Sequence, residues 1–274
     1  MKRLLVSILV VAALAGCRPE APTQPDASLP GVQAPTAQAA PAPVVLEDVV
    51  ETDPRYIIGI TWPEGVDRYP GLAVLLKEYA DAARAEVMQA VEGLEPDATA
   101  MYDLALEFRI LADTPQVFAV AADGGSYTGG AHGTPLIARF VWLPQEDRLL
   151  APSDLVADAA AWREVSSYVR EQLHAALSQR VDADELGPDE RARVMRSAGR
   201  MIDEGTAPEA DNFAQFEPVM GADGSVAALR FVFPPYQVGP YSDGVQTVEV
   251  PAAVLLPHVA SAYRPLFSSA LAAQ

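Results

Sequence analysis

A histidine in a glycine-rich segment is the first candidate for chemistry in this chain. Residues 127–133 read Tyr-Thr-Gly-Gly-Ala-His-Gly, and glycine permits backbone conformations that are closed to other residues. His132 could act there as a general base, but its two ring nitrogens could also fix the loop through hydrogen bonds. Because His174 and His258 fall on predicted helices far along the chain, we favour the second, structural interpretation. Tyr127 and His132 remain candidate binding residues.

A second segment combines proline with tyrosine. Residues 234–244 read Pro-Pro-Tyr-Gln-Val-Gly-Pro-Tyr-Ser-Asp-Gly. Tyrosine between prolines presents a large contact surface at a small entropic cost, which suits a recognition loop. Tyr236, Pro240 and Tyr241 are therefore candidate binding residues. Tyr236 could equally pack the loop against the fold, whereas Tyr241 is the stronger candidate for exposure.

Other catalytic patterns give weaker signals. No Gly-x-Ser-x-Gly motif occurs that would expose a nucleophilic serine. Asp123, Asp223 and Asp243 each precede glycine, and since this dipeptide is typical of turns, we interpret all three as turn residues. Among 37 acidic residues no pair can be singled out for glycosidase chemistry. Three scattered histidines are a weak metal signal, so we expect no metal site and no cofactor.

Hydrophobic periodicity predicts the elements that position the two segments. Alternation over residues 102–110 predicts a half-buried strand, and three- and four-residue spacing over residues 70–91 predicts an amphipathic helix. Ser153 is expected to cap a long helix, and Pro188 to open another that ends near residue 204. Further strands are expected at residues 56–61, 117–121, 136–143, 213–219, 226–233 and 245–250, with a helical region after residue 251.

This order of elements indicates the fold class. Neighbouring strands are joined by short turns and the helices stand in separate blocks, which is typical of an α+β fold with a mainly antiparallel sheet packed with amphipathic helices. We expect residues 46–274 to form a single domain of this kind. No βαβ nucleotide-binding pattern and no internal repeat of fixed period is evident.

The two segments together resemble a known family. A Tyr-Thr-Gly-Gly-Ala-His-Gly stretch between two strands, followed later by Pro-Tyr-x-x-x-Pro-Tyr-x-x-Gly, is similar to the extracytoplasmic domain of RsiV-like anti-sigma factors and of PdaC-type peptidoglycan deacetylases. The resemblance covers residues 53–259. In RsiV-like proteins this domain binds lysozyme, a small basic enzyme. We see neither a sigma-binding segment with a membrane helix nor a deacetylase domain with its metal ligands, so signalling and deacetylation are not implied.

The first residues resemble a bacterial lipoprotein precursor. A positive start is followed by an apolar run over residues 4–14, about half the length that spans a bilayer. Leu14-Ala15-Gly16-Cys17 is similar to a lipobox, so residues 1–16 are expected to be a signal peptide that is removed before Cys17. The cysteine would then carry acyl chains such as palmitate and anchor the protein to a membrane.

Residues that follow the cysteine predict the placement of the protein. Residues 17–45 are rich in Pro, Ala, Gln and Thr and are expected to be a disordered tether. Arg18 stands where aspartate would signal inner-membrane retention, which favours the outer membrane facing the periplasm in a two-membrane cell. Since Cys17 is the single cysteine, the folded part has no disulfide and must be stabilised by its core.

The strong negative charge limits which classes of partner the protein can bind. Without the two basic residues of the signal peptide, the formal net charge of −18 becomes −20, which repels nucleic acid and attracts cationic proteins. The leading hypothesis is a non-enzymatic cell-envelope lipoprotein that binds a basic protein such as lysozyme, or a cell-wall component such as peptidoglycan. The alternative is an envelope hydrolase of peptidoglycan or another glycan that uses His132. A purely architectural lipoprotein is a third interpretation.

Overall fold

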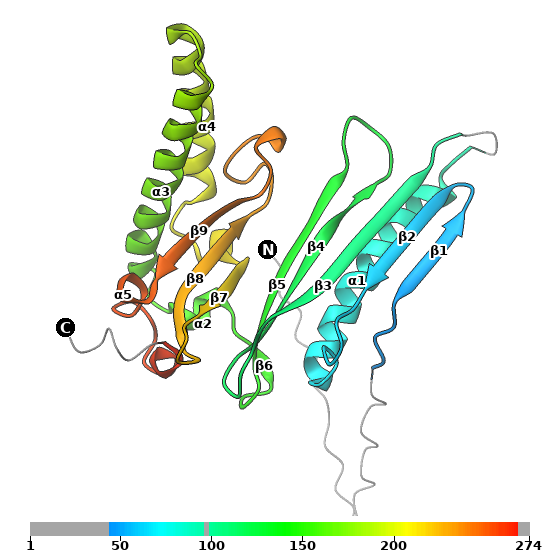
Figure 1. The fold of residues 1–274 in the computed structure, drawn as a ribbon, viewed down its shortest axis with the longest axis horizontal. Coiled ribbons are helices and arrows are strands. Elements are labelled where there is room, and N and C mark those ends of the chain that lie inside the picture. The colour runs from blue at the N-terminus through cyan, green and yellow to red at the C-terminus, as the bar shows by residue number, and fades with distance from the viewer. Residues whose placement is uncertain (1–43, 96–98, 268–274) are drawn as a thin grey trace, which may run out of the picture. The chain divides into compact units, whose positions relative to one another are not determined.

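Six strands from the N-terminal half of the folded region form one sheet in sequence order. A computed structural model describes residues 44–95 and 99–267. Its first sheet consists of β1 (Val49–Asp53), β2 (Tyr56–Thr61), β3 (Tyr102–Asp113), β4 (Phe118–Tyr127), β5 (Thr134–Leu143) and β6 (Arg148–Leu149). Adjacent strands are antiparallel except β2 and β3, which are parallel and connected through helix α1 (Pro70–Glu92) (Figure 1). The fold therefore contains one strand–helix–strand crossover that we did not predict.

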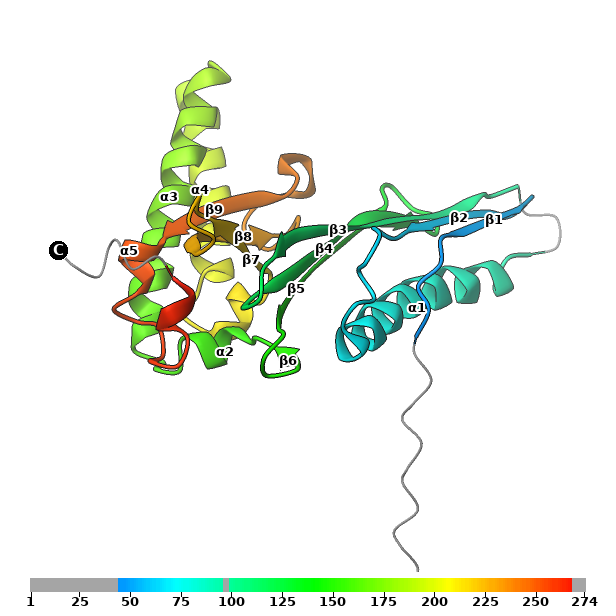
Figure 2. The same ribbon diagram turned by 60° about the horizontal axis from the view of Figure 1, so that its bottom comes forward.

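Helix α1 covers one face of this sheet (Figure 2). Its buried side chains include Leu72, Leu76 and Val87, each 0% exposed, and they share a core with Leu104 and Phe108 of β3. The predicted apolar stripe and the predicted alternation in β3 are both confirmed. Burial of such aliphatic side chains contributes about 1.5–3 kcal/mol each, which is why periodicity located these two elements reliably.

Tyr79 of α1 gives this core a measurable pH dependence. Its ring lies edge-on to Phe108 and Phe140, with centroids 6.4 and 5.9 Å away. Burial, and secondarily the charge of Asp123, raises the pKa of Tyr79 to about 12 from its usual value of 10.0. The neutral phenol is favoured in the fold, so the stability that this shift contributes is present below pH 10 and is lost as the pH rises towards 12.

We expect Tyr79→Phe to flatten this alkaline loss of stability. Urea unfolding of wild type and variant at about pH 8 and at several values up to about pH 11.5 would measure it. The difference between the two proteins isolates Tyr79 from the other groups that titrate there. Parallel pH profiles would contradict the prediction.

Three strands and the remaining helices form the C-terminal half. The second sheet has the antiparallel order β7 (Phe216–Met220), β8 (Val226–Phe233), β9 (Gln246–Pro251). Helices α3 (Ala161–Ala183) and α4 (Pro188–Gly205) pair with each other and share a second core with this sheet. Short elements complete it: α2 (Pro152–Leu155), α5 (Ala252–Leu255) and the 3-10 helices η1 (Ala210–Phe213), η2 (Tyr241–Asp243) and η3 (Arg264–Leu266).

The α+β class is confirmed, but several boundaries differ from the prediction. The expected sheet is divided into two. Strand β1 was not predicted, because its sequence Val-Val-Glu-Thr-Asp shows little alternation. Ser153 does not cap a long helix: it lies inside the short α2, whose N-cap is Ala151, and α3 begins only at Ala161. Residue 213 belongs to η1 rather than to the following strand.

Part of the predicted organisation lies outside the described residues. This applies to the signal peptide, to Cys17 and to the tether up to residue 43. Within residues 44–95 and 99–267, no helix has the length and apolar character needed to cross a bilayer. The described part of the chain falls into one compact unit.

Candidate functional site

Glycine shapes the loop between β4 and β5, which contains the first candidate segment. Gly129 and Gly130 have φ angles of 100° and 96°, a region that side chains with a Cβ rarely adopt. The hydroxyl of Tyr127 donates a hydrogen bond to the carbonyl oxygen of Gly130 at 3.1 Å. Tyr127 is half-buried and closes the loop that carries His132.

Strain marks the second segment, which connects β8 to β9. Tyr236 has a φ angle of 73°, an uncommon conformation for a residue other than glycine, and one that costs about 1–3 kcal/mol. Its N–H donates to the carbonyl oxygen of Gly239 at 2.9 Å. The neighbouring Gln237 donates from Nε2 to the carbonyl oxygens of Gly205 and Asn212 at 3.0 and 2.8 Å. These contacts hold the tyrosine in place.

The two segments, about a hundred residues apart in sequence, meet in space. Nε2 of His132 lies 2.8 Å from the hydroxyl of Tyr236. The rings of His132 and Tyr241 stack with centroids 4.0 Å apart and an angle of 17° between their planes. The two tyrosine rings lie 5.9 Å apart. We call the surface made by His132, Tyr236 and Tyr241 the two-loop surface.

Both ring nitrogens of His132 are hydrogen-bonded, as the structural interpretation requires. Nδ1 lies 3.1 Å from the carbonyl oxygen of Gly133, and because a carbonyl can only accept, Nδ1 is assigned the proton. In this tautomer Nε2 accepts from the hydroxyl of Tyr236. His132 is therefore the link that joins the two segments.

Exposure of the tyrosines is the reverse of what we predicted. Tyr236 is 56% exposed, whereas Tyr241 is half-buried under the stack with His132. Tyr236 combines this exposure with a positive φ angle, and no sequence pattern revealed either feature. Pro240 is exposed beside them and precedes η2. The tyrosine that we expected to pack against the fold is thus the more accessible one.

His132 contacts a backbone carbonyl, a tyrosine hydroxyl and a tyrosine ring. A histidine that acts as a base is ordinarily oriented by a carboxylate, but in the part of the chain that the structure describes no hydrogen bond or ion pair joins His132 to one. No group of three His, Cys, Asp or Glu side chains among the described residues is placed to hold a metal.

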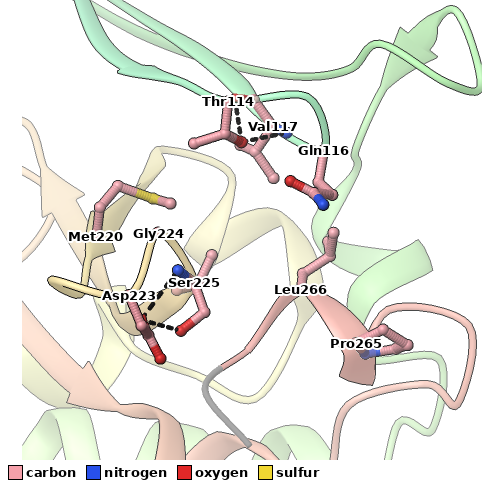
Figure 3. A pocket seen from close by; sticks show the side chains of 10 residues that line it. Thr114, Gln116, Val117, Met220, Asp223, Gly224, Ser225, Pro265 and Leu266 are labelled. Carbon is pink, nitrogen blue, oxygen red and sulfur yellow. Dashed lines mark hydrogen bonds between the residues drawn. The ribbon is translucent and has the colours of Figure 1, made fainter.

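Two cavities are of a size to note. One, of about 170 Å³, is bordered by Thr114, Gln116, Ser225 and Leu266 and has no lining residue from either segment (Figure 3). In it the hydroxyl of Ser225 donates to Asp223 at 2.6 Å, and Gly224 has a φ angle of 80°. The predicted turn at Asp223 is confirmed. The second cavity, of about 240 Å³, lies between α3 and α4 and is bordered by Pro240.

The turn predicted at Asp123 is wrong, and Asp123 contacts charged residues that we did not predict to form a network. Asp123 lies within β4, where it accepts hydrogen bonds from Arg109 and Arg139. Arg139 also pairs with Glu217 at 2.7 Å, and these two side chains are 7% and 9% exposed. Each interrupts an otherwise apolar strand, a pattern that could have indicated a buried ion pair.

Comparison with known protein families finds a match in the C-terminal half. Residues 153–253 match a family described as "Protein of unknown function (DUF3298)". This match includes Tyr236, Pro240 and Tyr241 but not Tyr127 or His132. The match covers less than half of the chain, and the two-loop surface requires residues from outside the matched stretch.

Solved structures of proteins from this family are similar to the chain. A family member from Pseudomonas aeruginosa PAO1 shares 14% identity with a TM-score of 0.53, covering 81% of this chain and 96% of that one. A member from Bacteroides fragilis shares 17% identity with a TM-score of 0.45, covering 79% and 93%. No curated protein matches the chain. The Pseudomonas structure thus shares the fold, and the comparisons assign no activity.

Proposed function

We propose that this protein is a cell-envelope lipoprotein whose folded region binds a basic protein through the two-loop surface, without catalysing a reaction. The observation that carries the proposal is the meeting of His132, Tyr236 and Tyr241 from two loops into one aromatic surface. Exposed tyrosine held by a strained backbone is characteristic of recognition sites rather than of packing.

Charge supports a cationic partner. The chain has a formal net charge of −18, which accelerates the encounter with a basic protein at low salt. Aromatic rings also attract lysine and arginine side chains through their faces, within about 6 Å. Tyr236 offers such a face to solvent. A partner that presents arginine or lysine would satisfy both the long-range and the short-range preference of this surface.

The lipid anchor places the proposed site in the envelope. The lipobox-like Leu14-Ala15-Gly16-Cys17 supports acylation of Cys17, and residues 17–45 would tether the folded region to the outer membrane, facing the periplasm. Mass spectrometry of protein from its native host measures this directly, since an acylated N-terminal Cys17 is the expected form. An unmodified Cys17 or an uncleaved leader would remove the anchor from the proposal.

Hen lysozyme is the first basic protein to test, because the two segments resemble those of the RsiV-like domain. We expect isothermal titration to detect binding at about 20 mM salt and weaker binding at about 300 mM salt, since ions screen charge attraction. Tyr236→Ala should weaken binding about 30-fold or more, as expected for a central aromatic contact. Ile57→Ala is the matched control, because Ile57 is 44% exposed and lies on β2.

The possible results of this titration distinguish a wrong binding site from a wrong partner. Absence of heat at low salt would remove lysozyme as the partner. Equal affinity of wild type and Tyr236→Ala would remove the two-loop surface as the site. Sedimentation with purified peptidoglycan that depends on Tyr236, without binding of lysozyme, would retain the site and reassign its partner to the cell wall.

A further inference from the structure

The two-loop surface depends on the alignment of two sheets. His132 follows β4 of the six-stranded sheet, whereas Tyr236 and Tyr241 follow β8 of the three-stranded sheet. No ladder of backbone hydrogen bonds joins the two sheets, which are separate in the strand pairing of the described residues. A contact at 2.8 Å across two loops therefore depends on side-chain contacts between the sheets, which include an apolar core shared by Val141 of β5 and Phe216 of β7.

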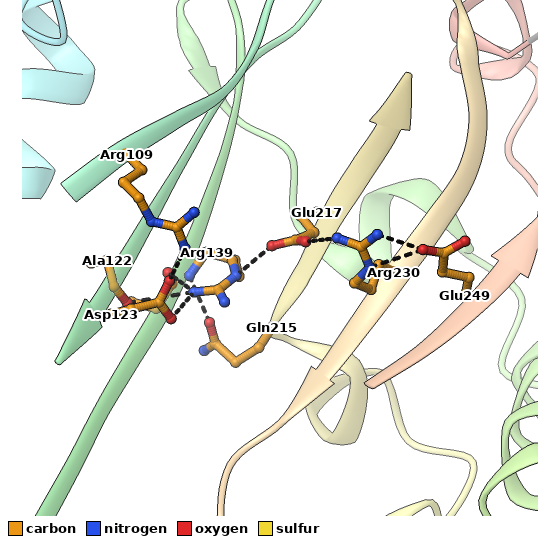
Figure 4. Close-up of polar contacts among 9 residues, drawn as sticks. Arg109, Ala122, Asp123, Arg139, Gln215, Glu217, Arg230 and Glu249 are labelled. Atoms are coloured by element: carbon orange, nitrogen blue, oxygen red, sulfur yellow. Dashed lines mark hydrogen bonds and ion pairs between the residues drawn. The ribbon is translucent and has the colours of Figure 1, made fainter. Parts of the chain in front are cut away.

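A chain of alternating charges adds directional polar contacts between the two sheets (Figure 4). Each of the six strands β3, β4, β5, β7, β8 and β9 contributes one member, in the order Arg109, Asp123, Arg139, Glu217, Arg230 and Glu249. The ion pair between Arg139 and Glu217 crosses from the first sheet to the second. Within the second sheet, Arg230 donates hydrogen bonds to Glu249 and Glu217, and these bonds, that to Glu249 first, raise the pKa of Arg230.

Among the six charged residues, Arg139 is the one on the first sheet that forms contacts with the second. Its Nε donates to Glu217 at 2.7 Å and its Nη1 to Asp123 at 2.8 Å. Its backbone N–H donates to the side-chain oxygen of Gln215 at 2.8 Å. The guanidinium is only 7% exposed, and a buried ion pair is satisfied only at the geometry that brings all its partners together. Arg139 thus distinguishes one alignment of the sheets from others.

A short path connects this pair to the second loop. Gln215 lies two residues after η1, and the carbonyl oxygen of Asn212 in η1 accepts from Gln237 at 2.8 Å. Gln237 is the residue after Tyr236. Displacement of Gln215 relative to Arg139 would therefore move the residue that anchors the exposed tyrosine.

We propose that Arg139 is the positioning residue of the two-loop surface: through Glu217 and Gln215 it aligns the two sheets so that His132 meets Tyr236 and Tyr241. The biological meaning of this role rests on the proposed function, but the alignment is a property of the free protein. It can therefore be measured without a partner.

Histidine NMR signals provide that measurement. Since the ring of His132 stacks on Tyr241 at 4.0 Å, the ring current of the tyrosine should move its proton signals upfield. In Arg139→Met, whose side chain keeps the apolar stem, we expect most of this displacement to be lost, while the signals of His258 stay unchanged. Affinity for hen lysozyme should fall about tenfold in the same variant, the loss expected when a site is correctly aligned in a tenth of the molecules.

Two further variants make the result decisive. Arg84→Met breaks an ion pair of similar geometry, 2.8 Å to each oxygen of Glu51, that lies within the first sheet and α1, and it should leave His132 unchanged. Glu217→Gln removes one charge and keeps a hydrogen-bond acceptor, so it should displace His132 less, in the same direction. This variant decides the question if Arg139→Met does not fold.

Unchanged His132 signals in a folded Arg139→Met protein, or in Glu217→Gln if the first variant is unfolded, would overturn the proposal. Loss of the upfield displacement in Arg84→Met to the same extent would also overturn it, because the effect would then be general. If the displacement is lost as expected but wild type binds no lysozyme, the partner fails and the positioning role of Arg139 stands.

Discussion

Replacing Phe213 by alanine should lower the free energy of unfolding by about 3–5 kcal/mol, which is the range for buried aromatic truncations. Phe213 is 1% exposed. Its ring stacks on Trp162 at 5.0 Å and meets Phe231 and Phe233 edge-on at 5.3 and 6.2 Å. The substitution therefore removes contacts with α3 and β8 at once and leaves a cavity that cannot collapse easily. Urea unfolding followed by circular dichroism measures the change.

Val74→Ala is the control for this prediction. Val74 is 39% exposed on α1, so its truncation should change stability by no more than about 0.5 kcal/mol. The slope of unfolding against urea should stay equal in all three proteins, because the surface exposed on unfolding hardly changes. A loss below about 1 kcal/mol for Phe213→Ala would show that the C-terminal core is not organised around this ring.

Gly205→Ala should displace the loop that carries Tyr236. A Cβ at Gly205 would lie 2.0 Å from the carbonyl oxygen and 2.7 Å from the carbonyl carbon of Gln237, so backbone must move. The hydrogen bond from Gln237 to the Gly205 carbonyl oxygen would be strained as well. We expect a loss of about 1–3 kcal/mol in stability from this overpacking, and at least a tenfold loss of affinity for hen lysozyme.

Gly59→Ala tests whether that effect comes from the close approach. A Cβ at Gly59 would meet nothing within 4 Å, and alanine in a strand restricts the unfolded chain more than glycine does. The stability of this variant should equal that of wild type or exceed it by up to about 1 kcal/mol, and its affinity should stay unchanged. If Gly205→Ala binds hen lysozyme as tightly as wild type does, the position of the loop that contains Gln237 does not control binding.

The candidate site is shared between two halves of the chain. The DUF3298 match covers residues 153–253, which supply the tyrosines, while His132 comes from the six-stranded sheet that precedes them. A fragment limited to the matched residues would therefore lack the hydrogen bond that links Tyr236 to the neighbouring loop. Studies of this surface need both sheets in one chain.

Sequence patterns were reliable where one element buries one face. The stripe of α1 and the alternation of β3 were read correctly, since side-chain burial there follows the helical and strand periods directly. The break between α2 and α3 was missed. Residues 157–160 hold no strong helix breaker such as glycine, and the interruption is accompanied by the Trp162 indole donating to the carbonyl oxygen of Val156 at 3.0 Å. That contact is formed by packing and leaves no local pattern.

By itself, the sequence determined the α+β class, because the periodicity of apolar residues follows the elements. It also indicated the two segments of the candidate site, because glycine and proline mark unusual backbone and tyrosine offers a large contact surface. The tertiary structure alone decided that the segments meet, that Tyr236 rather than Tyr241 is the exposed ring, and that Asp123 belongs to an ion network with Arg139. These features depend on contacts between residues far apart in the chain. Such contacts are fixed by how two sheets pack, and no short stretch of sequence encodes that packing.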